Sequence, residues 1–436
     1  MVSRGACDRP RGVGGGRDTG GVRRAVKVRL YPDPAQEALF AQTAGAARWV
    51  FNTGLAVRRD AWQDDQISVS TNDLMAMLPL WKEEFGWLRE VSDVALQQSL
   101  RNLDVAYGNF FRACRGEGRA RFPRFKTRNS RVAFRLTRNG FRVKDGQFYV
   151  AKNDQPVTFR DKGGYEIPAD ATSVTISKDA AGRWHASFLV DDVVPLPHQQ
   201  AGEMRVVGVD LGIKTLAVTS DGDEFENPKH FDKHARRLAK YQRMMSRRKP
   251  APGQRASNNY RKAQHKAGRV HARIADARRD TIHQTTTALA RRYDIVCIED
   301  LNVAGMVKNK KLARAISDAG FGEFRRQLEY KTTWYGTKLI VLDRWHPSSR
   351  LCHVCGWKNS ELRLSDRQWT CRDCGTLHDR DLNAAKVIAS AGLADYACGG
   401  DIRPQHPVPL DGTGNGSGNS RETGNNPTRA LARAAA

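Results

Sequence analysis

The stretch that decides the fold is RVVGVDLGIKTLAVTS, residues 205–220. It has the pattern of an apolar strand that ends in Asp210, a tight turn at Gly212 and a second apolar strand. The segment therefore predicts a β-hairpin with one carboxylate near its centre. Val207 and Val209 do not by themselves decide which face of the sheet this carboxylate occupies.

Two further acids follow apolar segments later in the chain. Residues 293–301, YDIVCIEDL, predict a buried strand that ends in Glu299 and Asp300, and residues 379–388, DRDLNAAKVI, predict the start of a helix that carries Asp381. Carboxylates at the ends of buried strands are uncommon without a reason, although a single one is more often a cap or turn residue.

Three acids on separate elements suit metal-dependent phosphodiester cleavage. That reaction uses carboxylates to hold two divalent ions roughly 3.5 to 4 Å apart. We expect Asp210, Glu299 and Asp381 to be the catalytic ligands of Mg²⁺ or Mn²⁺, with Asp300 and Asp379 as secondary alternatives.

Residues 352–375, CHVCGWKNSELRLSDRQWTCRDCG, predict a zinc ribbon. Two C-x-x-C pairs, fifteen residues apart, can place four thiolates around one zinc ion, and four cysteines leave no open position for catalysis. We expect structural Zn²⁺ on Cys352, Cys355, Cys371 and Cys374, with His353 and His378 as alternative ligands. The remaining cysteines are scattered singly, which is the pattern of a metal site and not of disulfides.

The composition favours a polyanionic partner. The chain has 436 residues and a formal net charge of +25, and it is long enough for two to four domains. Nucleic acid is the leading partner, and a merely basic soluble protein is the alternative. The sequence contains no run of 18 apolar residues, so it predicts no membrane span, and the first 24 residues lack the apolar segment of a secretory signal. We therefore expect a cytoplasmic protein without membrane partners.

Two basic segments are candidates for nucleic-acid contact. Residues 229–292 have a helical pattern and contain nineteen Lys and Arg but only three acidic residues, all Asp. We expect Arg236, Arg237, Arg247 and Arg248 to contact phosphates. In residues 121–142 basic residues alternate with phenylalanines, which predicts strands with a phosphate-facing side and makes Arg124 and Lys126 further candidates. The alternative for both segments is a solvated basic surface.

Three short segments, GVDLGIKTLAV, IEDL and DRDLNAAKVI, resemble the three RuvC motifs of the TnpB (OrfB) family of insertion-sequence proteins, which are related to the compact type V CRISPR effectors. VRLYPDPAQ, LQQSLRNLDVAYGNFF, FPRFK and CGGDIRP extend the resemblance over about residues 25–404. The resemblance implies an RNA-guided endonuclease, directed by an element-encoded guide RNA to double-stranded DNA beside a short motif. It also assigns the catalytic acids to Asp210, Glu299 and Asp381.

The expected fold is a multidomain α/β protein with an RNase H-like (RuvC) nuclease core, a small β-barrel, a helical recognition domain and a zinc ribbon. The predicted parts are a disordered leader (1–24), a wedge-like β-barrel (25–32 and 129–200), a helical recognition domain (33–128), the nuclease core (201–345 and 377–392) with the basic helical insertion (229–292), the zinc ribbon (346–376) and a largely disordered C-terminal segment (393–436). Two other functions remain open, a strand-transfer transposase and a non-cleaving RNA- or DNA-binding regulator.

Overall fold

The structure is a computed structural model. It describes residues 22–128, 130–160, 167–192, 204–363 and 365–397. The first 21 residues of the predicted leader, the CGGDIRP motif and residues 398–436 of the predicted C-terminal segment lie outside the described residues.

The N-terminal strand belongs to a five-stranded antiparallel sheet in the order β2-β6-β7-β1-β5. β1 begins at Val22, three residues before the strand expected from Ala25, and it pairs with β7 and β5. β2 and β5 stand at the two ends of this order, and closure into a barrel stays a prediction. The strands are β1 Val22–Leu30, β2 Val132–Thr137, β3 Phe141–Lys144, β4 Gln147–Val150, β5 Phe159–Arg160, β6 Ser173–Lys178 and β7 Trp184–Asp192, with β3 and β4 forming a separate hairpin.

The prediction of strands over residues 121–142 is wrong in its first half. The described part of this segment has regular strand only from Val132 onward, in β2 and at the start of β3. Pro123 has no backbone N–H to offer a ladder. The backbone N–H of Lys126 donates to Asn52 Oδ1 and its carbonyl accepts from Asn52 Nδ2, at 2.8 and 2.9 Å. This stretch therefore bonds to a helix side chain instead of a neighbouring strand.

Helices follow β1 as expected. α1 begins at Pro34 behind a capping box, in which Asp33 accepts from the backbone N–H of Gln36 at 2.8 Å. Phe40 of α1 packs edge-on against Trp184 of β7, with ring centroids 5.4 Å apart. The helices here are α1 Pro34–Asp65, α2 Thr71–Glu84 and α3 Asp93–Cys114, with short 3-10 turns at Gly86–Glu90 and Arg138–Gly140.

The segment 205–220 forms the hairpin that its sequence predicts, inside a second, mixed sheet in the order β10-β9-β8-β11-β12. β8, β11 and β12 are parallel, whereas β9 and β10 are antiparallel additions. The strands are β8 Val206–Leu211, β9 Thr215–Thr219, β10 Glu224–Glu226, β11 Ile295–Glu299 and β12 Lys338–Leu342. The helices are α4 His230–Arg247, α5 Asn258–Arg292, α6 Val303–Met306, α7 Ala313–Ala319, α8 Phe321–Tyr335 and α9 Arg380–Ala397.

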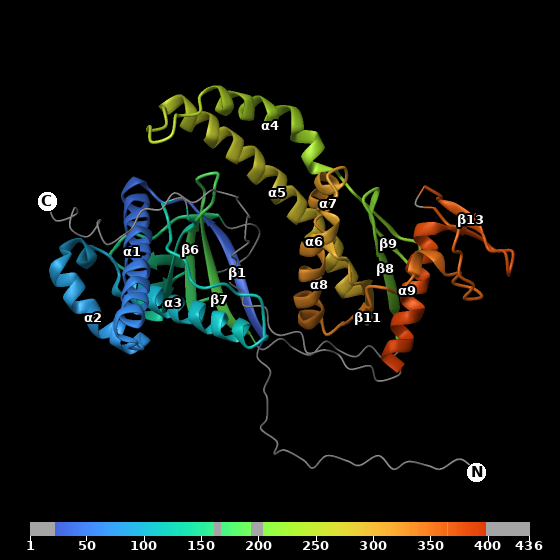
Figure 1. Cartoon of the computed structure of the whole chain (residues 1–436), viewed down its shortest axis with the longest axis horizontal. Helices are drawn as coiled ribbons and strands as arrows, with labels where there is room; N and C mark the ends of the chain where they lie inside the picture. The colour runs from blue at the N-terminus through green and yellow to red at the C-terminus, as the bar shows by residue number, and fades with distance from the viewer. Residues whose placement is uncertain (1–21, 129, 161–166, 193–203, 364, 398–436) are drawn as a thin grey trace, which may run out of the picture. The chain divides into compact units, whose positions relative to one another are not determined.

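Side chains of β8 and β11 point alternately to the two faces of the sheet, with α5 and α8 packed on one face and α9 on the other (Figure 1). Val207 and Val209 pack with residues of α5 and α8 in one buried cluster. On the other face a Cβ at Gly208 would overlap the backbone of α9 at Ala385, and one at Gly392 of α9 would overlap Cys297. Only glycine permits this approach of helix to sheet, and Asp210, two residues beyond Gly208, therefore faces α9.

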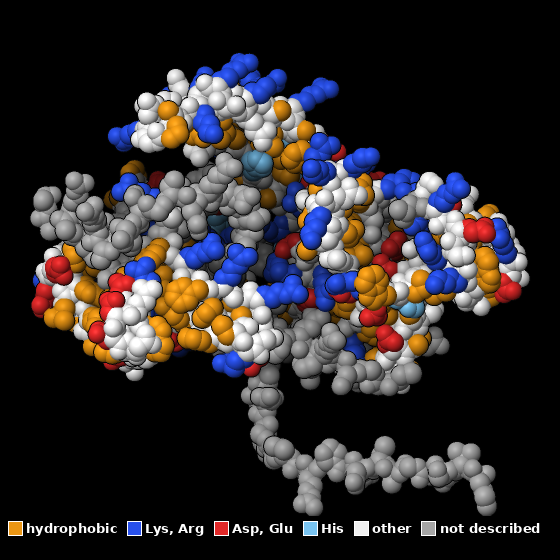
Figure 2. All heavy atoms as spheres, viewed as in Figure 1, with side chains coloured by type: hydrophobic (Ala, Val, Ile, Leu, Met, Phe, Trp, Pro, Cys, Tyr) orange, Lys and Arg blue, Asp and Glu red, His pale blue; other side chains and the backbone are white. Residues whose placement is uncertain are grey.

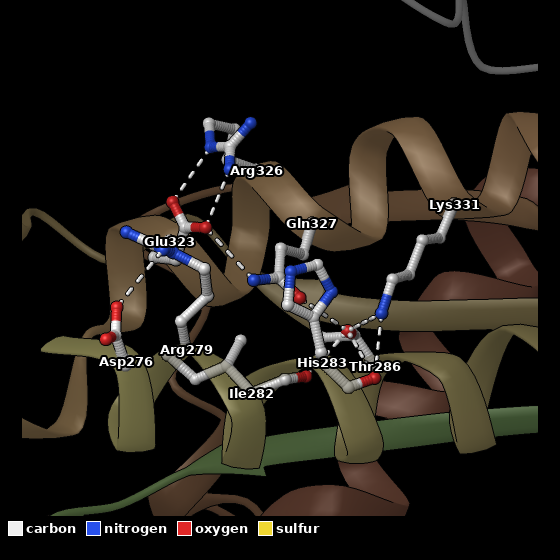
Figure 3. A network of polar contacts seen from close by, with 9 residues as sticks. All are labelled: Asp276, Arg279, Ile282, His283, Thr286, Glu323, Arg326, Gln327 and Lys331. Atoms are coloured by element: carbon white, nitrogen blue, oxygen red, sulfur yellow. Dashed lines mark hydrogen bonds and ion pairs between the residues drawn. The ribbon is translucent and has the colours of Figure 1, made fainter. Parts of the chain in front are cut away.

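A buried polar network joins α5 to α8 (Figure 3). Lys331 is 3% exposed, and its ammonium donates to the carbonyl of His283 and to the hydroxyls of Thr286 and Thr287, at 2.7 to 2.8 Å. Gln327 continues the network, because its amide oxygen accepts from Thr286. Among the described residues, the hydrogen-bond acceptors of the Lys331 ammonium are thus all neutral oxygens.

The C-terminal part contains a small two-stranded sheet, with β13 Gln368–Thr370 paired to β14 Leu377–Asp379, and a 3-10 turn at Ser348–Arg350. α9 runs on to Ala397, so the first residues of the segment expected to be largely disordered are helical. A helix with the length and apolar character of a membrane span is absent from the described residues.

Candidate active site and metal centre

The structure brings Asp210, Glu299 and Asp381 together at the carboxyl-terminal ends of the central strands of the second sheet. β8 and β11 pair in register up to Val209 and Ile298, so Asp210 and Glu299 come next on adjacent parallel strands. Glu299 shares the α9 face with Cys297 by the same alternation that places Asp210 there. Asp381 stands in the first turn of α9, four residues before Ala385.

The carboxylates of Glu299 and Asp381 lie near enough to Asp210 to affect its ionisation. Burial, followed by the charges of Glu299 and Asp381, raises the pKa of Asp210 to about 7. Such a cluster is unfavourable without a cation, and oxygen ligands of this type suit Mg²⁺ or Mn²⁺. The arrangement is wider than the cysteine cluster described below, which is the only set in the described part of the chain whose possible ligand atoms all lie within 4.8 Å.

Two side chains that the sequence did not single out contact these acids. Ser348, which is 2% exposed, donates its hydroxyl to Glu299 Oε1. Arg367, which precedes β13, lies 3.3 Å from Asp381 Oδ2. Arg367 lies within the cysteine-bearing segment 352–375 but is not one of its expected ligands, and Ser348 precedes that segment, so their contacts with the acids follow only from their position in space.

The carboxylates of Asp300 and Asp379, the two secondary alternatives, are both engaged in other contacts. Asp300 forms ion pairs with Arg325 and Arg344. Asp379 accepts hydrogen bonds from the backbone N–H groups of Asp381 and Leu382, each at 3.0 Å, which is the role of an N-cap. These contacts favour Asp210, Glu299 and Asp381 as the reactive set.

The four cysteines predicted to bind zinc come together. The sulfurs of Cys352 and Cys374 are 3.7 Å apart, those of Cys355 and Cys371 are 3.6 Å apart, and all four lie within 4.8 Å of one another. Gly356 and Gly375 follow the two pairs with φ of 76° and 70°, and each donates its N–H back to the first cysteine carbonyl of its pair. This cluster can hold a metal ion.

The alternative histidine ligands lie outside the four-sulfur set. His378 is buried, with Nε2 3.1 Å from the Cys352 sulfur, so it contacts a ligand atom. His353 contacts Asn383 of α9 through its backbone N–H and its ring. Asn383 also donates to the carbonyl of Leu351 at 2.7 Å, so the cysteine-bearing segment is bonded directly to the helix that carries Asp381.

The basic insertion forms the expected helical pair, α4 and α5. Arg236, Arg237, Arg247 and Arg248 are all exposed, and none has an ion pair with an acid in the described part of the chain. Figure 2 shows Lys and Arg side chains spread over this pair. Unpaired positive charge of this kind suits a phosphate backbone.

The two candidates in the FPRFK segment differ from each other. Arg124 is exposed. The ammonium of Lys126 lies 3.7 Å from the ring centroid of Phe51, and burial lowers its pKa to about 8. The charge of Lys126 is therefore directed inward, and phosphate contact by either residue stays a prediction.

Comparison with known proteins first defines the class of fold. The chain is similar to Cas12f1 in a structure titled as its complex with sgRNA and target DNA, with a TM-score of 0.51, 13% identity and coverage of 84% of this chain and 98% of that one. At this identity the likeness concerns the fold alone. The model of the Cas12f1-like TNB domain matches residues 321–388.

Sequence relatives define the family. The OrfB_IS605 model, described as "Probable transposase", matches residues 187–310, and a helix-turn-helix domain of the same family matches residues 22–66. A Streptomyces pristinaespiralis protein named as a candidate RNA-guided DNA endonuclease is 46% identical, over 88% of this chain and 93% of its own length. The Escherichia coli protein InsQ, named in the same way, is 33% identical over 89% of this chain and 97% of its own length. The chain belongs to the OrfB_IS605 (TnpB-like) family.

Proposed function

We propose that this protein is an RNA-guided, metal-dependent endonuclease that cuts double-stranded DNA beside a short motif, with an RNase H-like (RuvC) site made of Asp210, Glu299 and Asp381. The convergence of these three acids from β8, β11 and α9 carries the proposal. Relatives named as RNA-guided DNA endonucleases, similar over nearly their whole length, support it.

The residues at the site fit a pair of divalent ions. Burial, followed by two acidic neighbours, raises the pKa of Asp210, and a bound cation would stabilise the ionised carboxylate in this environment. Bound there, Mg²⁺ or Mn²⁺ would activate water and stabilise the leaving oxygen of the phosphodiester. The described residues supply the oxygen ligands on three rigid elements, which suits a geometry that must not shift during the reaction.

The neighbouring side chains set the orientation of the ligands. The hydroxyl of Ser348 fixes one oxygen of Glu299 and leaves the other free to bind. The guanidinium of Arg367 lies 3.3 Å from Asp381 Oδ2 and balances part of its charge. Cleavage breaks the phosphorus–oxygen bond to the leaving strand, the oxygen of a water molecule bonds to phosphorus in its place, and a proton of that water is transferred to the leaving oxygen.

We assign the remaining parts by the same proposal. The four cysteines hold one structural Zn²⁺, and the hydrogen bonds of Asn383 connect that centre to the helix of Asp381. The exposed cations of α4 and α5 contact the backbone of the guide RNA or of its duplex with target DNA.

The test is RNA-dependent cleavage by purified protein in Mg²⁺. Replacing Asp210, Glu299 or Asp381 by Ala should lower the cleavage rate by roughly 100-fold or more and leave RNA-dependent DNA binding nearly intact. Asp395→Ala, an exposed acid on the same helix as Asp381, is the matched control and should cut normally.

The outcomes separate the three functions. Cleavage by all three alanine variants at the wild-type rate would reject this site. Joining of DNA ends by the wild-type protein would point to a strand-transfer transposase, and tight binding with no cleavage under any metal would point to a regulator.

A further inference from the structure

A basic pocket lies between α4 and α5, about 200 Å³ in volume. Its floor includes Val270, which is 6% exposed, and the partly buried ring of Tyr241. Four cations border it, with one from α4 and three from α5: Arg237, Lys266, Arg269 and Arg273.

The spacing along each helix builds this arrangement. Lys266, Arg269 and Arg273 lie three and then four residues apart, so they form one stripe on α5. Arg237 and Tyr241 are four residues apart on α4, and the guanidinium of Arg237 bonds to the Tyr241 hydroxyl. The two stripes face each other across the seam of the helical pair.

The charge of the pocket is unbalanced within the described residues. The three acids of the helical pair are engaged elsewhere: Asp232 with Arg314, Asp276 with Arg183 and Arg279, and Asp280 with Gln284. None of the four pocket cations forms an ion pair with an acid in the described part of the chain. Like charges gathered at this density favour an anionic occupant.

We infer that this pocket is a subsite for one unstacked nucleotide of a single-stranded nucleic acid, with its base against Tyr241 and Val270 and its flanking phosphates between the four cations. The apolar floor argues for a base as well as a phosphate, because a duplex keeps its bases paired and offers only its backbone to such a surface. The inference rests on the proposed nucleic-acid function and specifies what one of its surfaces binds.

The experiment measures binding of the full chain to single strands of about 12 nucleotides, a length typical of such sites. RNA and DNA strands are compared with the same strands made without bases. Tyr241→Ala should weaken binding of the strands that carry bases by roughly 5- to 100-fold, the loss expected for one stacked base. Tyr241→Phe should bind as wild type, and strands without bases should bind the wild type and the two Tyr241 variants alike.

Two controls make the result specific. Tyr260→Ala, at the start of α5 and outside the pocket, should have no effect. Arg237→Ala should weaken binding more than Arg243→Ala, which removes the same charge from an exposed position on α4. A greater loss of affinity for RNA in Tyr241→Ala assigns the bound nucleotide to RNA, and a greater loss for DNA assigns it to DNA.

Equal effects of Tyr241→Ala and Tyr260→Ala, or equal losses for strands with and without bases, would overturn the subsite. Target cleavage by the wild-type protein tests the nuclease proposal separately, so either proposal can fail alone.

Discussion

Gly208 of β8 lies directly beneath the carbonyl of Ala385 in α9, so closely that a Cβ on the glycine would overlap that oxygen. This contact fixes the distance between the sheet that bears Asp210 and Glu299 and the helix that bears Asp381. It also gives the most local test of how the site is built.

Gly208→Ala should displace α9 and cost about 3 kcal/mol of unfolding free energy, because the obstacle is backbone and cannot rotate away. Cleavage should fall much more than nucleic-acid binding. Gly322→Ala in α8, where a Cβ meets nothing within 4 Å, is the control and should leave stability unchanged or slightly higher. Thermal unfolding and cleavage rates measure both, and a Gly208→Ala protein with normal stability would contradict the contact.

Ser348→Ala should slow cleavage by about tenfold and raise the Mg²⁺ concentration needed for half-maximal rate, because a hydrogen bond to a charged group contributes roughly 1.5 to 3 kcal/mol. The acid itself remains, so the activity should not vanish. Ser390→Ala on the exposed side of α9 removes an equivalent hydroxyl away from the site and should behave as wild type. A rate loss without a change in metal requirement would argue against a positioning role for Ser348.

Cys371→Ser should release the bound zinc, from about one ion per chain to nearly none, and expose the surrounding segment to protease. Cleavage should be lost, since Asn383 links this segment to the helix of Asp381. Cys114→Ser, at an exposed free cysteine of α3, should keep both zinc and activity. Full zinc content in Cys371→Ser would show that another ligand set holds the metal.

Lys331 predicts a pH dependence of stability. Burial lowers its pKa to about 8 from an ordinary value of 10.5, so the folded state binds fewer protons than the unfolded state between these pH values. The resulting penalty is fully present below pH 8 and is relieved as the pH rises toward 10.5. Unfolding by urea across this range should therefore show a rising contribution from Lys331 in the wild-type protein.

Lys331→Met isolates that contribution. It keeps the length of the side chain and removes the charge, and Thr286 retains its bond to the carbonyl of Ile282. The difference in stability between wild type and variant should change steadily from pH 8 to 10.5. A constant difference would show that the lysine titrates normally.

Much of the site could be predicted from the sequence because its signals are local. Four signals are each contained in a short segment: the hairpin of residues 205–220, the acids at or next to the ends of β8 and β11, the first turn of α9 with Asp381, and the paired cysteines. Hydrophobic alternation and ligand spacing act over a few residues, so they can be recognised without the fold.

Other features depend on residues far apart in the chain. Alternation shows that Asp210 and Val209 point to opposite faces, but only the packing of α5, α8 and α9 decides which face is which. Glu299 and Asp300 are adjacent in sequence, and the ion pairs of Asp300 with two arginines favour Glu299 as the candidate ligand. The sequence pattern predicts Lys126 to be a surface cation, and only the structure shows that its ammonium lies over the ring of Phe51. The sequence by itself determined most of the elements and the chemical groups they carry, although not the backbone of residues 121–128. The tertiary structure alone decided which groups meet, because burial and electrostatic coupling depend on distance in space and not on distance along the chain.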